Sequence, residues 1–117
     1  MNIEELSILF SAIICALGVF YIVIGIFNFC AKKPVRFYRF EKPLNSSQLV
    51  NVAKWNKCHG MMWIIFGAVI CITALPAFFI KESTVYQYIA LGLCVVMGVP
   101  AMMVYHKYLK NKYLNKQ

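Results

Sequence analysis

Three long stretches without a charged residue constrain this chain more than any other feature. They run from Leu6 to Cys30, from Met61 to Ile80 and from Val85 to Tyr105. A helix that crosses the hydrocarbon core of a bilayer needs about 20 mostly apolar residues, and each stretch reaches that length. Continuous apolar runs lack the period-two alternation of membrane β-strands. We therefore predict an all-α, integral membrane bundle of three helices.

The composition excludes a water-soluble enzyme domain. Of the 117 residues, 62% are hydrophobic and 14% charged, against about 45–50% and about 25% in soluble domains. The first stretch is longer than the apolar region of a signal peptide and follows an acidic start, Glu4 and Glu5. We expect it to be retained as a helix, so that residues 1–117 form one membrane domain.

The positions of the basic residues predict the orientation in the membrane. No Lys or Arg precedes the first stretch, seven lie between the first and second, only Lys81 lies between the second and third, and four follow the third. Cytoplasmic segments carry the excess of positive charge. We predict a protein of the cytoplasmic membrane with its N-terminus outside, and with loop 31–58 and tail 106–117 in the cytoplasm.

The net charge of +8 is better explained by this topology than by nucleic-acid binding. Basic residues beside a membrane attract anionic lipid headgroups by about 1 kcal/mol each. We therefore expect the lipid bilayer and its anionic headgroups as partners, and no nucleic acid.

Small residues spaced along the stretches predict where helices pack. They fit contacts within one chain and contacts in a homo-oligomer equally well, and are Ser11, Ala12, Cys15, Ala16, Gly18, Gly25, Gly60, Gly67, Cys71, Ala90, Cys94 and Gly98. Pro76 and Pro100 interrupt the second and third stretches, either as hinges or, more commonly, as static kinks.

The cytoplasmic loop is predicted to contain a short interfacial helix before the second span. Asn45 and Gln48 have the spacing of a capping box, and one face of the following helix would carry Leu49, Val52, Ala53 and Asn56. Trp55 would anchor this helix at the interface, and Gly60 would allow the chain to bend into the membrane. The prolines before it, Pro34 and Pro43, favour an extended segment.

The sequence shows no catalytic constellation, and we predict no enzyme activity, no cofactor and no metal site. The five cysteines lack paired spacing, and two of them lie on the reducing cytoplasmic side, so no structural disulfide is expected. A weaker alternative is a Cu(I) site from soft ligands near the cytoplasmic boundary. Its candidate ligands are Cys30, Cys58, His59, Met61, Met62, Met102, Met103 and His106.

One segment resembles a known family. Arg39, Glu41 and Asn51 lead into the run Trp55-Asn56-Lys57-Cys58-His59-Gly60, and Gly67 follows. This pattern resembles small bacterial three-pass proteins related to the SdpI immunity and signalling family, or a sister group of similar shape, over roughly residues 36–70. The resemblance implies protection against a membrane-active toxin, or signalling to a cytoplasmic partner.

We therefore expect a non-enzymatic protein of toxin-immunity or signalling type. The candidate partner-binding residues are Arg39, Glu41, Trp55, Asn56 and His59, although Trp55 and His59 are equally consistent with plain interface residues. Two alternatives remain: a small transporter or channel built by oligomerisation, and an accessory subunit of a larger membrane complex. The absence of charge within the spans weighs against a transport pathway.

Overall fold

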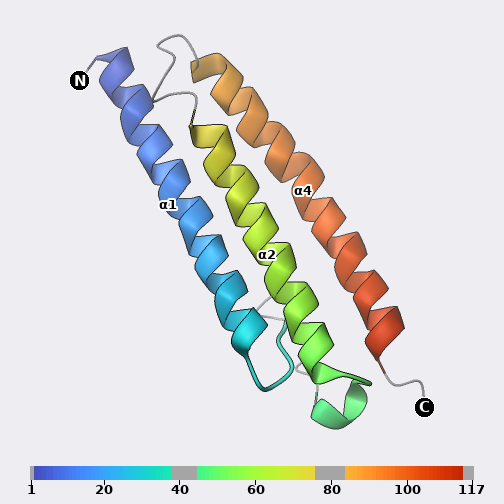
Figure 1. Ribbon diagram of the computed structural model, residues 1–117. Coiled ribbons are helices and arrows are strands. Elements are labelled where there is room, and N and C mark those ends of the chain that lie inside the picture. Colours follow the sequence, from blue (N-terminus) through green and yellow to red (C-terminus); the bar gives the residue numbers. More distant parts are fainter. Residues whose placement is uncertain (1, 38–44, 76–83, 115–117) are drawn as a thin grey trace.

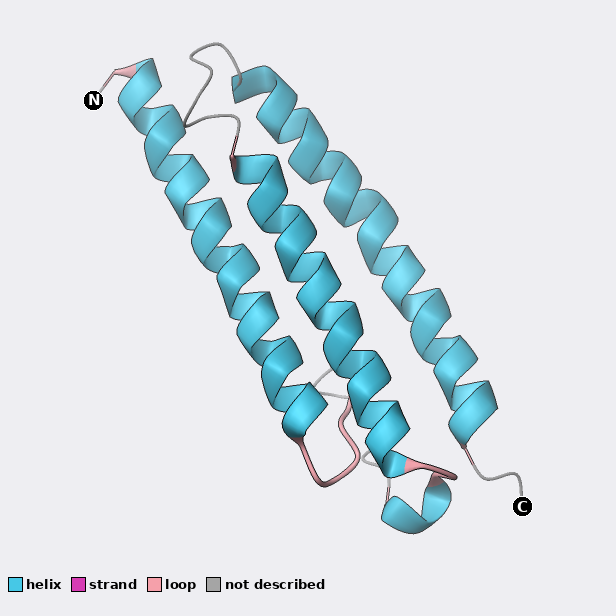
Figure 2. Cartoon of the chain, in the orientation of Figure 1, coloured by secondary structure: helices cyan, strands magenta, loops and turns pink. Residues whose placement is uncertain are grey.

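The computed structural model describes residues 2–37, 45–75 and 84–114, and within them the chain forms three long helices. They are α1 (Ile3–Cys30), α2 (Val52–Ala74) and α4 (Thr84–Tyr113). The helices lie side by side with α2 between the other two, as Figure 1 and Figure 2 show. Each is long and apolar enough to cross a membrane, which confirms the predicted all-α, three-pass architecture.

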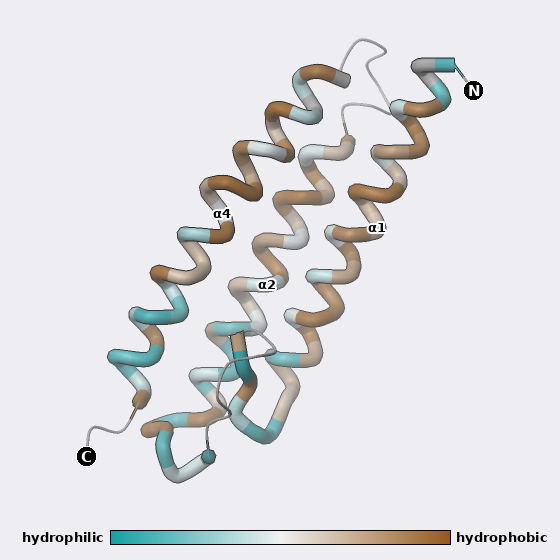
Figure 3. The backbone as a smooth tube through the Cα atoms, turned by 180° about the vertical axis from the view of Figure 1, so that it is seen from behind, coloured by the Kyte–Doolittle hydropathy of each residue, from teal (hydrophilic) through white to brown (hydrophobic). Residues whose placement is uncertain are grey.

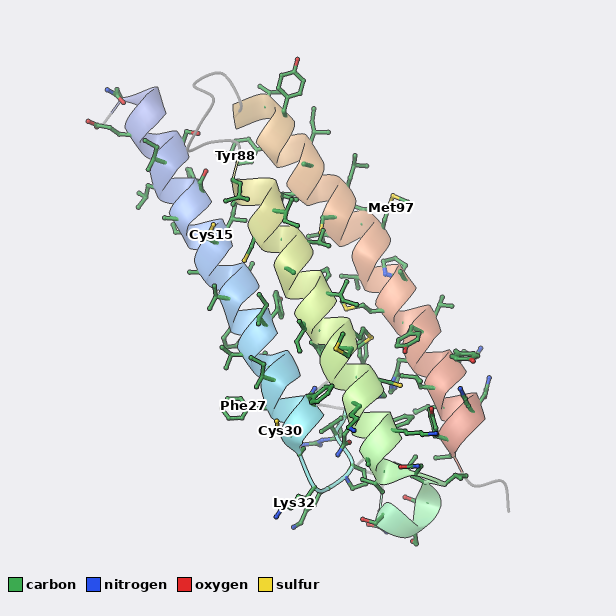
Figure 4. The ribbon with its side chains drawn as sticks, viewed as in Figure 1. Cys15, Phe27, Cys30, Lys32, Tyr88 and Met97 are labelled. Carbon is green, nitrogen blue, oxygen red and sulfur yellow. The ribbon has the colours of Figure 1, made fainter. Side chains whose placement is uncertain are left out.

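Apolar side chains surround the helices instead of facing a single interior. Phe27, for example, projects from α1 with 71% of its surface exposed (Figure 4). Hydrophobic residues line most of the length of all three helices, and hydrophilic residues gather at one end (Figure 3). A helix that is apolar on all sides is stable in lipid. We call this hydrophilic end, where α1 and α4 end and α2 begins, the basic end.

Helices α1 and α2 pack closely through two pairs of glycines. A Cβ atom added at Gly25 would lie 2.6 Å from the carbonyl oxygen of Gly60, and one at Gly18 would lie 2.7 Å from that of Gly67. The Cys71 thiol also donates to the Cys15 carbonyl, at 3.6 Å. These contacts confirm the prediction from small residues for this helix pair, as contacts within one chain. Ala12 and Ala16, by contrast, are exposed.

Helix α4 contacts α2 near the middle of the bundle and at the basic end. Near the middle, the ring of Phe66 lies against Gly98, where an added Cβ would be 2.9 Å from the ring. Beyond it, a buried cluster joins the end of α4 to the segment before α2; its members are Leu49, Trp55, Leu109 and Tyr113. The amide of Val50 donates to the Tyr113 carbonyl at 2.7 Å. The last turns of α4 are therefore attached to the start of α2 and to the segment that precedes it.

The predicted interfacial helix is not present in the described residues. The Asn45 amide does donate to the Gln48 side chain at 2.8 Å, but only the three-residue 3₁₀ turn η1 (Ser46–Gln48) follows it. The cap of α2 is Asn51, whose side chain accepts from the amide of Lys54 at 3.1 Å. Capping by Asn51 satisfies the first-turn amides of one long helix, so residues 52–59 belong to the spanning helix itself.

Two further details of that prediction are wrong. Helix α2 continues through Gly60 without ending, because this glycine provides the close approach to α1 instead of a bend. Trp55 is fully buried and so does not anchor the chain at a lipid interface. Both residues make contacts with segments that are distant in the sequence. A local sequence pattern carries no information about such contacts.

The third helix ends later than the predicted span. Helix α4 continues to Tyr113, because His106, Leu109 and Tyr113 bury one face of its last turns. It is also continuous across Pro100. The predicted end of the second span, residues 76–80 with Pro76, lies outside the described residues. Residues 81–83 of the predicted Lys81–Thr84 turn also lie outside them.

Candidate functional site at the basic end

Two neighbouring side chains of α2 hold the segment that follows α1. The amide side chain of Asn56 donates to the carbonyl oxygens of Ala31 and Lys33, at 3.0 and 2.9 Å, and accepts from the amide of Val35 at 3.0 Å. The indole of Trp55 donates to the Val35 carbonyl at 3.0 Å. Residues 31–35 form no helix or strand, so these side chains satisfy backbone groups that would otherwise lack partners.

A buried histidine pair joins α2 to α4 one turn further along. The Nε2 atom of His59 lies 2.8 Å from Nδ1 of His106, and Nδ1 of His59 lies 2.9 Å from the carbonyl oxygen of Trp55. His59 is fully buried and His106 is 7% exposed. Together we call Trp55, Asn56, His59 and His106 the polar hub.

The hydrogen bonds assign the tautomers of the neutral pair. A carbonyl oxygen only accepts, so Nδ1 of His59 carries a hydrogen and its Nε2 accepts from the Nδ1–H of His106. If both rings carried two hydrogens, two donors would face each other across 2.8 Å. The pair can therefore hold one additional proton at most without breaking this contact.

An aromatic stack continues from the hub toward α1. Phe37 stacks on His106 with a centroid separation of 4.9 Å, and on Trp63 at 5.6 Å; Trp63 in turn stacks on Tyr21 at 5.4 Å. The stack thereby places Phe37, from the segment after α1, between α2 and α4. The stack thus holds the C-terminal end of segment 31–37, whereas the hub holds its N-terminal part.

The structure brings together three of the five predicted partner-binding residues. Trp55, Asn56 and His59 lie close together and are fully buried, and Trp55 and Asn56 bind the backbone of residues 31–35. Arg39 and Glu41 lie outside the described residues. Whether the five bind a partner stays a prediction.

Sequence reasoning did not single out Val35, Phe37 or Trp63, or pair His106 with His59. The hub's bonds to Val35 span 20 or more residues and the histidine bond spans 47, so no local spacing marks them. Of the possible Cu(I) ligands, the structure brings the two histidines together. Within the described ranges, no group of three or more His, Cys, Asp or Glu side chains is placed to hold a metal ion. All five cysteines are free thiols.

The surface around the hub is positively charged. Segment 31–37 exposes Lys32, Lys33 and Arg36, with Lys32 at its outer turn (Figure 4). Lys57 lies with its ammonium 5.8 Å from the centre of the Phe29 ring. Among the residues that the structure describes, no acidic residue lies at this end, since Glu4 and Glu5 belong to the opposite end of α1.

An open groove separates α2 from α4 on the other side of the hub. It has a volume of about 890 Å³, and its lining runs from Cys58 to Thr73 on α2 and from Ala90 to Tyr105 on α4. The lining is almost wholly apolar and contains four methionines. We call it the α2–α4 groove.

Comparison with known proteins adds no relative to this description. The sequence matches no protein-family model, no curated protein and no solved structure.

Proposed function

We propose that this chain is a non-enzymatic three-pass membrane protein of toxin-immunity or signalling type. It presents segment 31–37 to a partner at the cytoplasmic face of the cell membrane, with its N-terminus on the outer side. The observation that carries this proposal is the polar hub, which holds an irregular segment in one conformation beside the membrane-spanning helices. The distribution of Lys and Arg along the sequence supports the orientation.

The hub supports recognition because of what its side chains hold. Trp55 and Asn56 make four hydrogen bonds with the backbone of residues 31–35. A loop held in one conformation binds a partner with less loss of conformational entropy, and binding residues are commonly placed on loops that a scaffold positions.

The charge of the segment indicates the chemistry of the partner. Lys32, Lys33 and Arg36 are exposed on it, and Arg39 and Glu41 follow in the sequence. Complementary charge speeds association and excludes partners of like charge. An acidic surface on a membrane-active toxin or on a cytoplasmic signalling protein matches this segment.

The test compares survival under toxin challenge in cells with and without the gene, using membrane-active toxins of the strain that carries it. We expect the Asn56→Ala variant to lose protection, because it releases three backbone groups of residues 31–35. The matched control is Asn111→Ala, at an exposed position of α4, which should protect as well as wild type. Immunoblots of membranes establish that both variants accumulate equally.

A photo-crosslinking residue at position 33 tests the signalling form of the proposal in the same cells. We expect a specific adduct that Asn56→Ala reduces and Asn111→Ala leaves intact. If the gene alters survival under none of the toxins, and position 33 yields no adduct that depends on Asn56, the proposal is wrong.

A further inference from the structure

The α2–α4 groove is long. Its lining covers 15 residue steps on each helix, from 58 to 73 and from 90 to 105, which corresponds to about 22 Å at 1.5 Å per residue. Its volume is about 890 Å³. The groove thus has the volume of a typical ligand site, about 300–1,000 Å³, in an elongated form.

The length and the flexible lining of the groove suit a hydrocarbon chain. A hydrocarbon chain is one methylene group wide and makes contacts at about 3.5–4.0 Å. Flexible Met61, Met62, Met97 and Met102 side chains adapt to such an irregular, mobile surface.

Small residues of α4 contribute to the groove. Ala90, Gly98 and Ala101 form part of the lining, and Gly98 lets the Phe66 ring approach the backbone of α4. The face of α1 on which Ala12 and Ala16 are exposed contributes no residue to the groove.

Within the described ranges, positive charge lies at the basic end of the groove. Lys54 precedes Cys58 by one turn, and Lys112 follows Tyr105 by two turns, so both continue the groove-facing stripes of their helices. Their neighbours Trp55 and Tyr113 belong to one buried cluster, so both lysines lie at the basic end. The Lys112 ammonium lies 5.4 Å from the centre of the Tyr113 ring.

We propose that the α2–α4 groove binds an anionic phospholipid, with an acyl chain along the groove and the headgroup at Lys54 and Lys112. The lipid belongs to the leaflet at the basic end. Half of the hydrocarbon core is about 15 Å thick, so a chain from this leaflet fits within the groove length. This proposal does not depend on the proposed function, because it concerns a different face of the bundle.

The experiment uses the full-length protein in vesicles of phosphatidylcholine that contain a trace of a photoactivatable lipid. The probe carries a diazirine in its acyl chain and is either phosphatidylglycerol or phosphatidylcholine, and adducts are mapped by mass spectrometry. We expect adducts on residues 58–73 and 90–105, with phosphatidylglycerol labelling more than phosphatidylcholine. Attraction of about 1 kcal/mol per lysine predicts about a fivefold loss of this preference for each lysine removed.

The chain offers matched controls for both charge and shape. The double variant Lys54→Gln/Lys112→Gln should abolish the preference, whereas Lys57→Gln/Lys107→Gln, with the same net charge, should keep it. Lys57 faces the Phe29 ring on α1, and Lys107 lies off the groove-facing stripe of α4. Ala101→Phe should block labelling in the groove, and Ala16→Phe on the outer face of α1 should not.

Three results would overturn the proposal. These are equal labelling by the two lipids in the wild-type protein, equal loss of preference in both double variants, and adducts concentrated on α1. An absence of lipid adducts on residues 58–73 and 90–105 would also contradict the proposal. Circular dichroism establishes that each variant retains wild-type helicity.

Discussion

At the scale of single residues, the arrangement at the basic end depends on bonds between polar side chains that are buried. His59 and His106 are joined by one hydrogen bond of 2.8 Å, in surroundings formed by Trp55 and Phe37. A polar group left unpaired away from water costs about 1–3 kcal/mol. The histidine pair should therefore couple α2 to α4 energetically as well as geometrically.

This coupling is measurable with a double-mutant cycle. We expect His59→Ala and His106→Ala to be non-additive in the free energy of unfolding in detergent, with a coupling of about 0.5–1.5 kcal/mol. The control cycle combines His59→Ala with Gly92→Ala, which lies far along α4 and has no neighbour within 4 Å. That cycle should be additive within about 0.5 kcal/mol. Equal coupling energies in the two cycles would contradict the hydrogen bond between His59 and His106.

At the scale of helices, α1 and α2 form a close pair, and α4 is attached through fewer contacts. Without a hydrophobic driving force between helices in lipid, association depends on close packing of backbones. The pairs Gly18–Gly67 and Gly25–Gly60 provide that packing. Helix α4 has one comparable position, Gly98 against Phe66, and its separation from α2 elsewhere leaves the groove.

Two glycine substitutions should change stability in opposite directions. In Gly67→Ala, the new Cβ would overlap the Gly18 carbonyl oxygen and lie 2.8 Å from Ile22, so α1 and α2 must separate, at a cost of about 1–3 kcal/mol. Gly92→Ala meets no atom within 4 Å and should stabilise α4 by up to about 1 kcal/mol through higher helix propensity. Thermal unfolding in mild detergent measures both, and a stabilised Gly67→Ala would refute the packing.

At the scale of the whole molecule, the charges divide between the two ends of a bundle whose longest dimension is 59 Å. The described acidic residues lie at the start of α1, and the basic residues lie at the opposite end. This separation is what a membrane protein needs to adopt one orientation. The orientation in turn determines which side of the membrane segment 31–37 faces.

Cysteine labelling in intact cells tests that orientation. In a variant that keeps Cys30 alone, which is exposed at the basic end, a membrane-impermeant maleimide should react only after the cells are permeabilised. A second variant, with Glu5→Cys as its single cysteine, should react in intact cells. The reverse pattern would place the basic end outside and remove the basis for a cytoplasmic partner.

The architecture could be predicted from the sequence, whereas the site could be predicted only in part. Runs of apolar residues are local patterns, and they indicated the three helices. The spaced small residues indicated packing surfaces but did not decide between contacts within one chain and contacts in an oligomer. The prediction for residues 45–60 was wrong because an interfacial helix and the first turns of a spanning helix share one amphipathic pattern. The capping bond of Asn51 and the burial of Trp55 decide between them, and both depend on surrounding residues.

The sequence alone therefore determined that the chain suits a lipid environment and that it forms three helices. The reason is that the free energies of transferring apolar side chains into lipid are nearly additive along a chain. Only the tertiary structure decided that Asn56 would bind residues 31–35, that His59 would meet His106, and that α4 would leave a groove beside α2. These features depend on the approach of groups that are 20 to 47 residues apart in the sequence. Such approaches follow from how whole helices pack, which no local pattern specifies.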